Sequence, residues 1–364
     1  MEVGNEEHYE AIGVMSGSSL DGLDLAWCTF RTSKGHWSFN IREARTVPYS
    51  PEFKARLANV MLGSAVELAR IHRDLGSLIG KACRDLLDGN RVDLIGSHGH
   101  TIFHKPKEGL TTQIGCGARI AAATSTTTVC DFRTMDVALG GQGAPLVPLG
   151  EKLLFPDHRA FLNIGGICNI ALHGADRVIG YDVCIGNQAL NFLAEETGLP
   201  YDTNGDLARS GKVDVDLLDR LNSLPFHSET PPRTLGREWF EEEIKPLISD
   251  RAIPLANRSC TAVEHIATMI ATSLRQAPGT VLTTGGGAHN GFLIERIQAL
   301  SDKLIKIPNA LTVDFKEALI FALLGVRRWR NGTTALGSVT GASRDSVGGA
   351  VYSHGGGDKG KDRP

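Results

Sequence analysis

Two glycine-rich turns and one carboxylate carry the chemistry that this sequence is able to perform. Asp182 follows the apolar run 178–181 and precedes the helical spacing of 187–196, so we expect its carboxylate at the C-terminal edge of a strand. The turns at 16–22 and 284–290 lie at opposite ends of the chain. Their backbone N–H groups suit phosphate oxygens. We therefore expect the turns to hold a nucleotide and Asp182 to act on the acceptor of its phosphoryl group.

The N-terminal turn lies between apolar segments that are typical of strands. Residues 11–15, 23–30 and 37–42 predict a β-meander with a glycine-serine hairpin at 16–22. Such a hairpin presents N–H groups and hydroxyls to one point, and its two carboxylates could hold Mg²⁺ through water. An ordinary tight hairpin is the alternative. The predicted nucleotide contacts are Gly17, Ser18, Ser19, Leu20, Asp21, Gly22 and Asp24, with Asp21 next to the metal.

A histidine-rich loop is expected after the apolar strand at 92–96. It contains His98, His100 and His104. Zinc binding would need a further cysteine or carboxylate, and none completes the set. We expect a polar rim around a sugar instead, with His98 and Thr101 touching it. Histidines that only satisfy loop carbonyls are the alternative.

Asp131, Arg133 and Asp136 form a charged group after the β-rich segment 126–130. An arginine there could bind a substrate carboxylate in bidentate fashion, and structural ion pairing with the two aspartates is the alternative. The glycines and prolines of 140–148 then break the pattern and indicate a domain junction, where a hinge would allow closure over ligands.

The second half of the chain repeats the pattern of the first. Strand, glycine turn and strand recur over 160–172, which suggests a duplicated core with one phosphate hairpin per lobe. Later, the glycines of 285–287 stand between a strand and the helix expected at 291–300, where they let the backbone approach an anion at the helix N-terminus. A plain β-to-α turn is the alternative. The glycines expected to contact nucleotide are Gly165, Gly166, Gly285, Gly286 and Gly287.

Composition narrows the class of protein. A chain of 364 residues exceeds what one core usually organises, so two domains are expected. The formal net charge is -3 with no long run of one sign, which argues against a nucleic-acid binder or a membrane-surface protein. No apolar run approaches the ~20 residues of a spanning helix, and residues 1–10 are too acidic for a signal peptide, so we expect a cytoplasmic protein. Scattered cysteines without a C-x-x-C pair are expected to be reduced thiols.

Several motifs occur together in this chain, at 13–24, 97–101, 131–133, 140–148, 163–166, 285–288 and 338–342. Jointly they resemble the anhydro-N-acetylmuramic acid kinase family of the acetate/sugar kinase, Hsp70 and actin superfamily. The resemblance implies an α/β fold of two actin-like (ribonuclease H-like) lobes, with ATP and Mg²⁺ in the cleft between them. We expect an N-terminal lobe at 1–138, a C-terminal lobe with the catalytic Asp and glycine loop at 139–350, and a disordered polar tail at 351–364. The resemblance also implies a homodimeric cytoplasmic enzyme of cell-wall recycling.

The resemblance further implies a reaction with two coupled events. Water opens the 1,6-anhydro bridge of anhydro-N-acetylmuramic acid at the anomeric carbon, while the freed O6 takes the γ-phosphoryl group of ATP. The products are N-acetylmuramic acid 6-phosphate and ADP. Asp182 matches the family's general base to that water, and His98, Thr101, Arg133 and Asn187 would bind the sugar.

The turn after Asp182 and two single positions depart from the family pattern. The commoner turn after the base runs Asp, Thr or Ser, Gly, Pro, Gly, Asn, whereas residues 182–187 read Asp-Val-Cys-Ile-Gly-Asn. His100 stands where Gln is usual, and Asn191 stands where many members are acidic. Two alternatives therefore stay open: a kinase for another anhydrosugar such as levoglucosan, and a non-catalytic sugar-sensing member of the superfamily.

Overall fold

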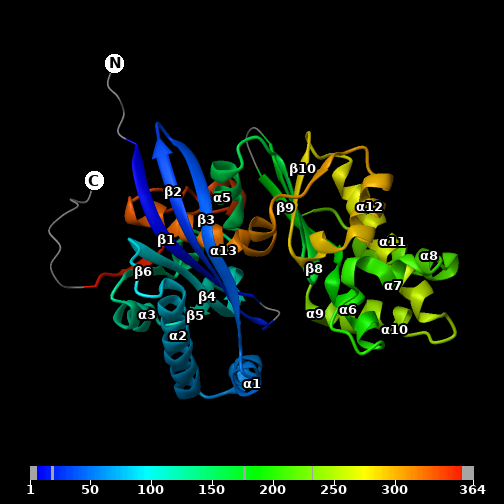
Figure 1. Cartoon of the computed structure of the whole chain (residues 1–364), viewed down its shortest axis with the longest axis horizontal. Coiled ribbons are helices and arrows are strands. Elements are labelled where there is room, and N and C mark those ends of the chain that lie inside the picture. The colour runs from blue at the N-terminus through cyan, green and yellow to red at the C-terminus, as the bar shows by residue number, and fades with distance from the viewer. Residues whose placement is uncertain (1–5, 18–19, 175–177, 232, 355–364) are drawn as a thin grey trace. The chain divides into compact units, whose positions relative to one another are not determined.

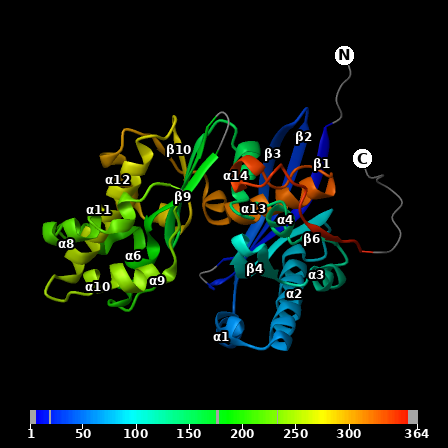
Figure 2. The same cartoon turned by 180° about the vertical axis from the view of Figure 1, so that it is seen from behind.

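The computed structural model describes residues 6–17, 20–174, 178–231 and 233–354. They form two compact units (Figures 1 and 2). The first takes in the chain up to Phe155 and from Phe315 onward, and the second runs from Pro156 to Asp314. The predicted lobes instead met at residues 138 and 139. The division differs because α5 (Val147–Leu154) and most of α13 (Ala310–Trp329) pack into the core of the first unit.

A mixed sheet forms the centre of the first unit (Figure 1). Its strands are β1 (Glu7–Ser16), β2 (Gly22–Ser33), β3 (His36–Pro48), β4 (Leu94–Lys105), β5 (Leu110–Ile114), β6 (Thr127–Cys130) and β12 (Ala350–Tyr352). β1, β2 and β3 form the predicted antiparallel meander, β4 runs parallel to β1, and β6 runs parallel to β4. β12 pairs antiparallel with β6, so a disordered tail starting at residue 351 is a wrong prediction. Residues 355–364 of that tail lie outside the described part.

Helices cover this sheet with two separate hydrophobic cores. They are α1 (Pro51–Asn59), η1 (Val60–Leu62), α2 (Ala65–Leu87), η2 (Pro106–Glu108), α3 (Gly117–Thr124), α4 (Thr134–Ala138), α5, α13 and α14 (Gly337–Thr340). Ser64 is the N-cap of α2, where its side chain accepts the Glu67 N–H, and the helix buries an apolar stripe in one core. α13 contributes to the other core and lies so close to β1 that a Cβ on Gly13 would stand 1.7 Å from the Ala318 carbonyl oxygen. Only glycine permits that approach.

The second unit has a sheet with the same order of strands. Its strands are β7 (Ala160–Ile164), β8 (Ile167–His173), β9 (Val178–Ile185), β10 (Val281–Thr284) and β11 (Ile305–Lys306). β7, β8 and β9 form an antiparallel meander, β10 runs parallel to β7, and β11 runs parallel to β10. The first unit builds β1 to β4 and β6 in the same way, so the predicted duplicated core and the ribonuclease H-like α/β fold are confirmed.

The helices of the second unit pack around α11, which lies in its hydrophobic core. They are α6 (Asn187–Glu195), η3 (Thr203–Gly205), α7 (Asp206–Arg209), α8 (Val215–Asn222), η4 (Pro225–Ser228), α9 (Arg237–Trp239), η5 (Phe240–Ile244), α10 (Lys245–Ile248), α11 (Leu255–Leu274), η6 (Gly286–His289) and α12 (Gly291–Leu300). Among the described residues of both units, no helix combines the length and the apolar character that crossing a bilayer requires.

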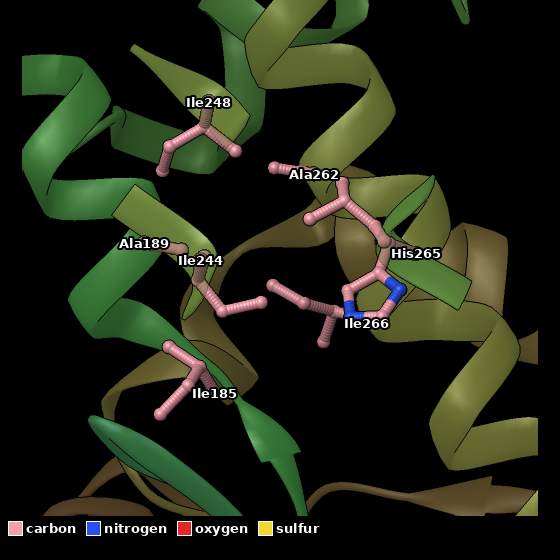
Figure 3. A pocket seen from close by; sticks show the side chains of 8 residues that line it. Ile185, Ala189, Ile244, Ile248, Ala262, His265 and Ile266 are labelled. Atoms are coloured by element: carbon pink, nitrogen blue, oxygen red, sulfur yellow. The ribbon is translucent and has the colours of Figure 1, made fainter. Parts of the chain in front are cut away.

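A small pocket lies in the core of the second unit, next to His265 of α11 (Figure 3). The other lining residues are Ile185, Ala189, Leu221, Ile244, Ile248, Ala262 and Ile266. None of them is a predicted site residue. His265 is buried, its Nδ1 lies 2.7 Å from Asn222 Oδ1, and its Nε2 has no described hydrogen-bond partner. The pocket therefore belongs to the packing of the core.

Acid should destabilise the second unit through His265. Burial lowers the pKa of His265 from 6.5 to about 3 in the folded protein, so unfolding takes up a proton between these values. Stability is therefore lost as the pH falls below the unfolded value, by up to ~1.4 kcal/mol per pH unit for this residue. Urea unfolding at several pH values should show a shallower pH dependence for His265→Gln than for the wild type. Equal dependences would contradict the assignment, and His36→Gln, at an exposed histidine, is the control.

Candidate active site

The β1–β2 hairpin is formed as predicted, with β1 ending at Ser16 and β2 beginning at Gly22. The Leu20 N–H donates to the Gly17 carbonyl at 3.3 Å, and Leu20 has a positive φ of 58°. A Cβ on Gly22 would stand 2.4 Å from the Val47 carbonyl oxygen, so contact with β3 already explains this glycine. The predicted contacts Ser18 and Ser19 lie outside the described residues.

Ser16 anchors the start of the hairpin, a feature that the sequence did not reveal. Its Oγ lies 2.6 Å from Tyr49 Oη and 2.9 Å from His100 Nδ1. Burial lowers the pKa of His100, and the bond to Ser16 partly opposes this. His100 therefore braces the turn as a neutral ring, and it lies inside β4 instead of in a loop.

The two carboxylates of the hairpin differ in their surroundings. The Asp21 side chain is 74% exposed, and one of its oxygens lies 3.7 Å from Lys54 Nζ. Asp24 accepts a hydrogen bond from Thr46 Oγ1 at 2.6 Å. An open carboxylate suits Mg²⁺, which keeps most of its waters and takes one or two protein carboxylates. The residues present therefore fit the predicted metal, with Asp21 as the accessible ligand.

His98 orients Arg133 and does not form an open rim. β4 continues through the histidine stretch as far as Lys105, so the predicted loop is wrong. His98 is only 3% exposed, its Nδ1 lies 2.9 Å from the Gly99 carbonyl, and its Nε2 accepts from Arg133 Nε at 2.9 Å. Burial, together with the positive charge of Arg133, lowers the pKa of His98 to about 3. Thr101 lies further along β4, with Gln113 Nε2 3.4 Å from its hydroxyl.

Arg133 keeps one end of its guanidinium group open. Nη1 donates to the Gly143 carbonyl at 2.8 Å, and within the described residues Nη2 donates no hydrogen bond. Among the described residues no ion pair joins Arg133 to either aspartate: Asp131 accepts from Thr134 Oγ1, and Asp136 accepts from Gly143 N. Burial lowers the pKa of Arg133 to about 10, while nearby Glu317 and Asp136 oppose this fall.

A carboxylate near Arg133, that of Glu317, escaped the sequence analysis. Glu317 lies on α13, and burial raises its pKa against the effects of Lys316 and Arg133. Lys316 Nζ lies 2.8 Å from Glu151 Oε1 in a buried ion pair that joins α13 to α5. No local motif in the sequence shows that Glu317 of this helix lies near Arg133.

Asp182 lies within β9, opposite Asn169 of β8, and not in a turn after the strand. Its main-chain N–H donates to the Arg233 carbonyl at 3.0 Å. Oδ2 accepts the Leu235 N–H at 2.8 Å, whereas Oδ1 accepts no hydrogen bond from the described residues. Burial raises the pKa of Asp182, and the Leu235 N–H and Arg233 oppose the rise. The carboxylate thus has one fixed oxygen and one available oxygen.

The glycine turns of the second unit meet around Asn187. The N–H groups of Gly186 and Asn187 donate to the carbonyls of Gly166 and Gly165, each at 2.9 Å. A Cβ on Gly287 would stand 2.9 Å from Asn187 Oδ1, and one on Gly286 would stand 3.6 Å from Asn187 Nδ2. The structure therefore brings Asn187, Gly165, Gly166, Gly285, Gly286 and Gly287 together.

α12 begins at Gly291 as predicted, after the turn that contains the three glycines. η6 stands between β10 and the helix, and Asn290 Oδ1 accepts the Leu293 N–H at 3.0 Å as the N-cap. The Asn290 side chain thus satisfies one of the N–H groups at the N-terminus of α12, where the anion site was expected. Close approach of a ligand remains open at Gly286, because a Cβ added there would meet only the side chain of Asn187 within 4 Å.

Comparison with known proteins gives a family match over most of the chain. Residues 9–354 match the family described as Anhydro-N-acetylmuramic acid kinase. The enzyme of that name from Gloeobacter violaceus is 34% identical over 363 residues, 92% of this chain and 96% of the relative. Its namesake from Vibrio cholerae is 35% identical over 365 residues, 94% of this chain and 97% of the relative. Among solved structures, a ROK family glucokinase from Streptomyces griseus aligns with 87% of this chain and 99% of its own, at 13% identity and a TM-score of 0.41.

Proposed function

The chain belongs to the anhydro-N-acetylmuramic acid kinase family, and from this premise we propose that it is an ATP-dependent kinase of anhydro-N-acetylmuramic acid. Water opens the 1,6-anhydro bridge, and O6 receives the γ-phosphoryl group. The products are N-acetylmuramic acid 6-phosphate and ADP, and the role is in peptidoglycan recycling. The family match over residues 9–354, which takes in both units, carries this proposal.

Asp182 is the proposed general base. Its Oδ1 takes a proton from water as the water oxygen bonds to C1 and the C1–O6 bond breaks. Its Oδ2 stays on the Leu235 N–H, which fixes the direction of the other oxygen. Burial raises the pKa of this carboxyl above its usual value, which moves it toward the range where a base works well near neutral pH.

The proposed nucleotide contacts are the β1–β2 hairpin and the glycine turns around Asn187. Gly286 leaves room for phosphate oxygens to approach the backbone closely. Asp21 would hold Mg²⁺ through water, and the metal would neutralise charge on the phosphates. Phosphoryl transfer depends mostly on such positioning and charge neutralisation.

Arg133 is the proposed recognition group for the lactyl carboxylate of the sugar. Two of its nitrogens are engaged by His98 and Gly143, so the guanidinium group is held in place before a substrate arrives. The open Nη2 then offers a charge-assisted hydrogen bond. Thr101 is a further proposed sugar contact.

We also propose that the protein is cytoplasmic and forms a homodimer.

Labelling with ¹⁸O-water tests the proposed reaction. The label should enter C1 of the product and not its phosphate, because water attacks carbon while O6 attacks phosphorus. Mass spectrometry of a short reaction, corrected for anomeric exchange, gives the measurement. An unlabelled phosphorylated sugar would contradict the hydrolytic step and indicate an ordinary sugar kinase. ADP release with levoglucosan alone would indicate another anhydrosugar as substrate, and nucleotide binding without turnover would indicate a sensor.

A further inference from the structure

Arg233 binds main-chain oxygens on both sides of a loop, although the reaction proposed above assigns it no role. Its Nη1 donates to the carbonyls of Phe226, His227 and Glu229, at 2.9, 3.1 and 2.9 Å. Its Nε donates to the Asp182 carbonyl at 3.2 Å. Among the described residues it forms no ion pair with a carboxylate. A guanidinium group directed at carbonyls in this way fixes backbone geometry.

The same loop supplies the hydrogen bond that orients Asp182. The Arg233 carbonyl accepts the Asp182 N–H at 3.0 Å, and two residues later the Leu235 N–H donates to Asp182 Oδ2 at 2.8 Å. The loop therefore pairs with the outer edge of β9 at this residue. The Leu235 side chain packs against the core of the second unit. This packing also helps to keep the Leu235 N–H in position.

Aromatic rings complete the surroundings of Arg233. Its guanidinium carbon lies 4.7 Å from the ring centroid of Phe226 and 5.6 Å from that of Tyr181, the residue before Asp182. Cation–π contact with both rings keeps the side chain between η4 and β9. A lysine would keep the charge but could not bond to four carbonyls in a fixed fork.

We infer that Arg233 is a positioning residue for the proposed base, and this inference rests on the proposed function. Arg233 joins η4 to β9, so that the Leu235 N–H stays on Oδ2 of Asp182 and Oδ1 is the oxygen that meets water. Without the Arg233 side chain, residues 233–235 separate from β9, and Asp182 rotates among several orientations.

Replacement of Arg233 by Gln tests this role. We expect kcat to fall by roughly tenfold to a hundredfold, because misplacement of a reacting group by about 1 Å has effects of this size. KM for ATP should stay near the wild-type value. The acid limb of the kcat/KM profile should move to higher pH, because Arg233 and the Leu235 N–H both hold the pKa of Asp182 down. In Arg233→Lys the acid limb should lie closer to its wild-type position, because the positive charge remains. Its kcat should recover less, because the bonds to the carbonyls are lost.

Two controls separate positioning from general damage. Arg209 also lies over a ring, 4.8 Å from the Phe292 centroid, and pairs with Glu295 in the same unit, so Arg209→Gln should leave kcat and the pH profile unchanged. Hydrogen exchange of the Leu235 amide needs no substrate. It should speed up in Arg233→Gln and stay slow in Arg209→Gln.

The outcomes distinguish this inference from the proposed function. Faster exchange at Leu235 together with the shifted acid limb supports positioning by Arg233. Wild-type exchange and an unmoved acid limb in Arg233→Gln overturn it, even if kcat falls. Faster exchange at Leu235 in an enzyme whose wild type releases no ADP from anhydro-N-acetylmuramic acid would uphold the link between Arg233 and Asp182 and reject the proposed substrate.

Discussion

Replacement of Asp182 by Asn should abolish turnover while ATP binds almost as before. The amide oxygen of Asn can accept the Leu235 N–H in place of Oδ2, so the side chain keeps its orientation. Its NH₂ group then stands where Oδ1 was and cannot take a proton from water. The expected loss in kcat is on the order of a hundredfold or more. Steady-state ADP release and a separate measurement of ATP affinity provide the test.

A matched carboxylate in the same unit serves as the control for this substitution. Asp214 is the N-cap of α8 and accepts the Leu217 N–H at 2.9 Å, and Asn is an equally good N-cap. Asp214→Asn should therefore keep both stability and turnover. If Asp182→Asn kept more than about a tenth of the wild-type kcat, Asp182 would not be the base.

Local sequence rules were sufficient for the two meanders and their turns. Apolar alternation broken by glycine predicted β1 to β2 and β7 to β8, and the structure has both pairs joined at the expected turns. These features depend on neighbours in the chain, which a single sequence displays. The order of the strands was not predicted, because β4 and β10 pair with β1 and β7 across long stretches of sequence.

Strand ends depend on partners that are distant in sequence. The prediction ended the strand before Asp182, yet β9 continues to Ile185 because Ile185 pairs with Ile167 and buries its side chain. β4 likewise continues through its histidines, since β5 pairs with it from His100 to Lys105. A polar residue inside a strand does not end it when pairing partners lie on the next strand.

Side-chain contacts of the candidate site were the least accessible to sequence reasoning. Arg133 and His98 were both selected, but as separate sugar contacts, and only the structure shows that one orients the other. Glu317 was missed entirely, although it lies near Arg133. His98 and Arg133 are 35 residues apart in the sequence, and Glu317 is much further from Arg133. At such separations the sequence gives no sign that two residues are in contact. Geometry at this level requires the packed fold.

Replacement of Arg133 by Ala should discriminate between substrates. A substrate with a carboxylate loses a charge-assisted hydrogen bond to Nη2, so we expect its KM to rise by the equivalent of roughly 2–4 kcal/mol of binding. Levoglucosan has no carboxylate to lose. Its turnover, if wild-type enzyme shows any, should change much less. The ratio of the two kcat/KM values is the measurement.

The ratio is informative because Arg133 also has a bracing role that affects every substrate. The alanine variant leaves His98 Nε2 and the Gly143 carbonyl without their partner, which costs about 1–3 kcal/mol of stability per buried group. That loss falls equally on both sugars and cancels in the ratio. His98→Gln is the matched variant, since it disturbs the brace and keeps the guanidinium group, and it should lower both kcat/KM values alike. Equal losses on both sugars for Arg133→Ala as well would mean that Arg133 only holds β4 to the 140–148 loop, and that the carboxylate is recognised by another group.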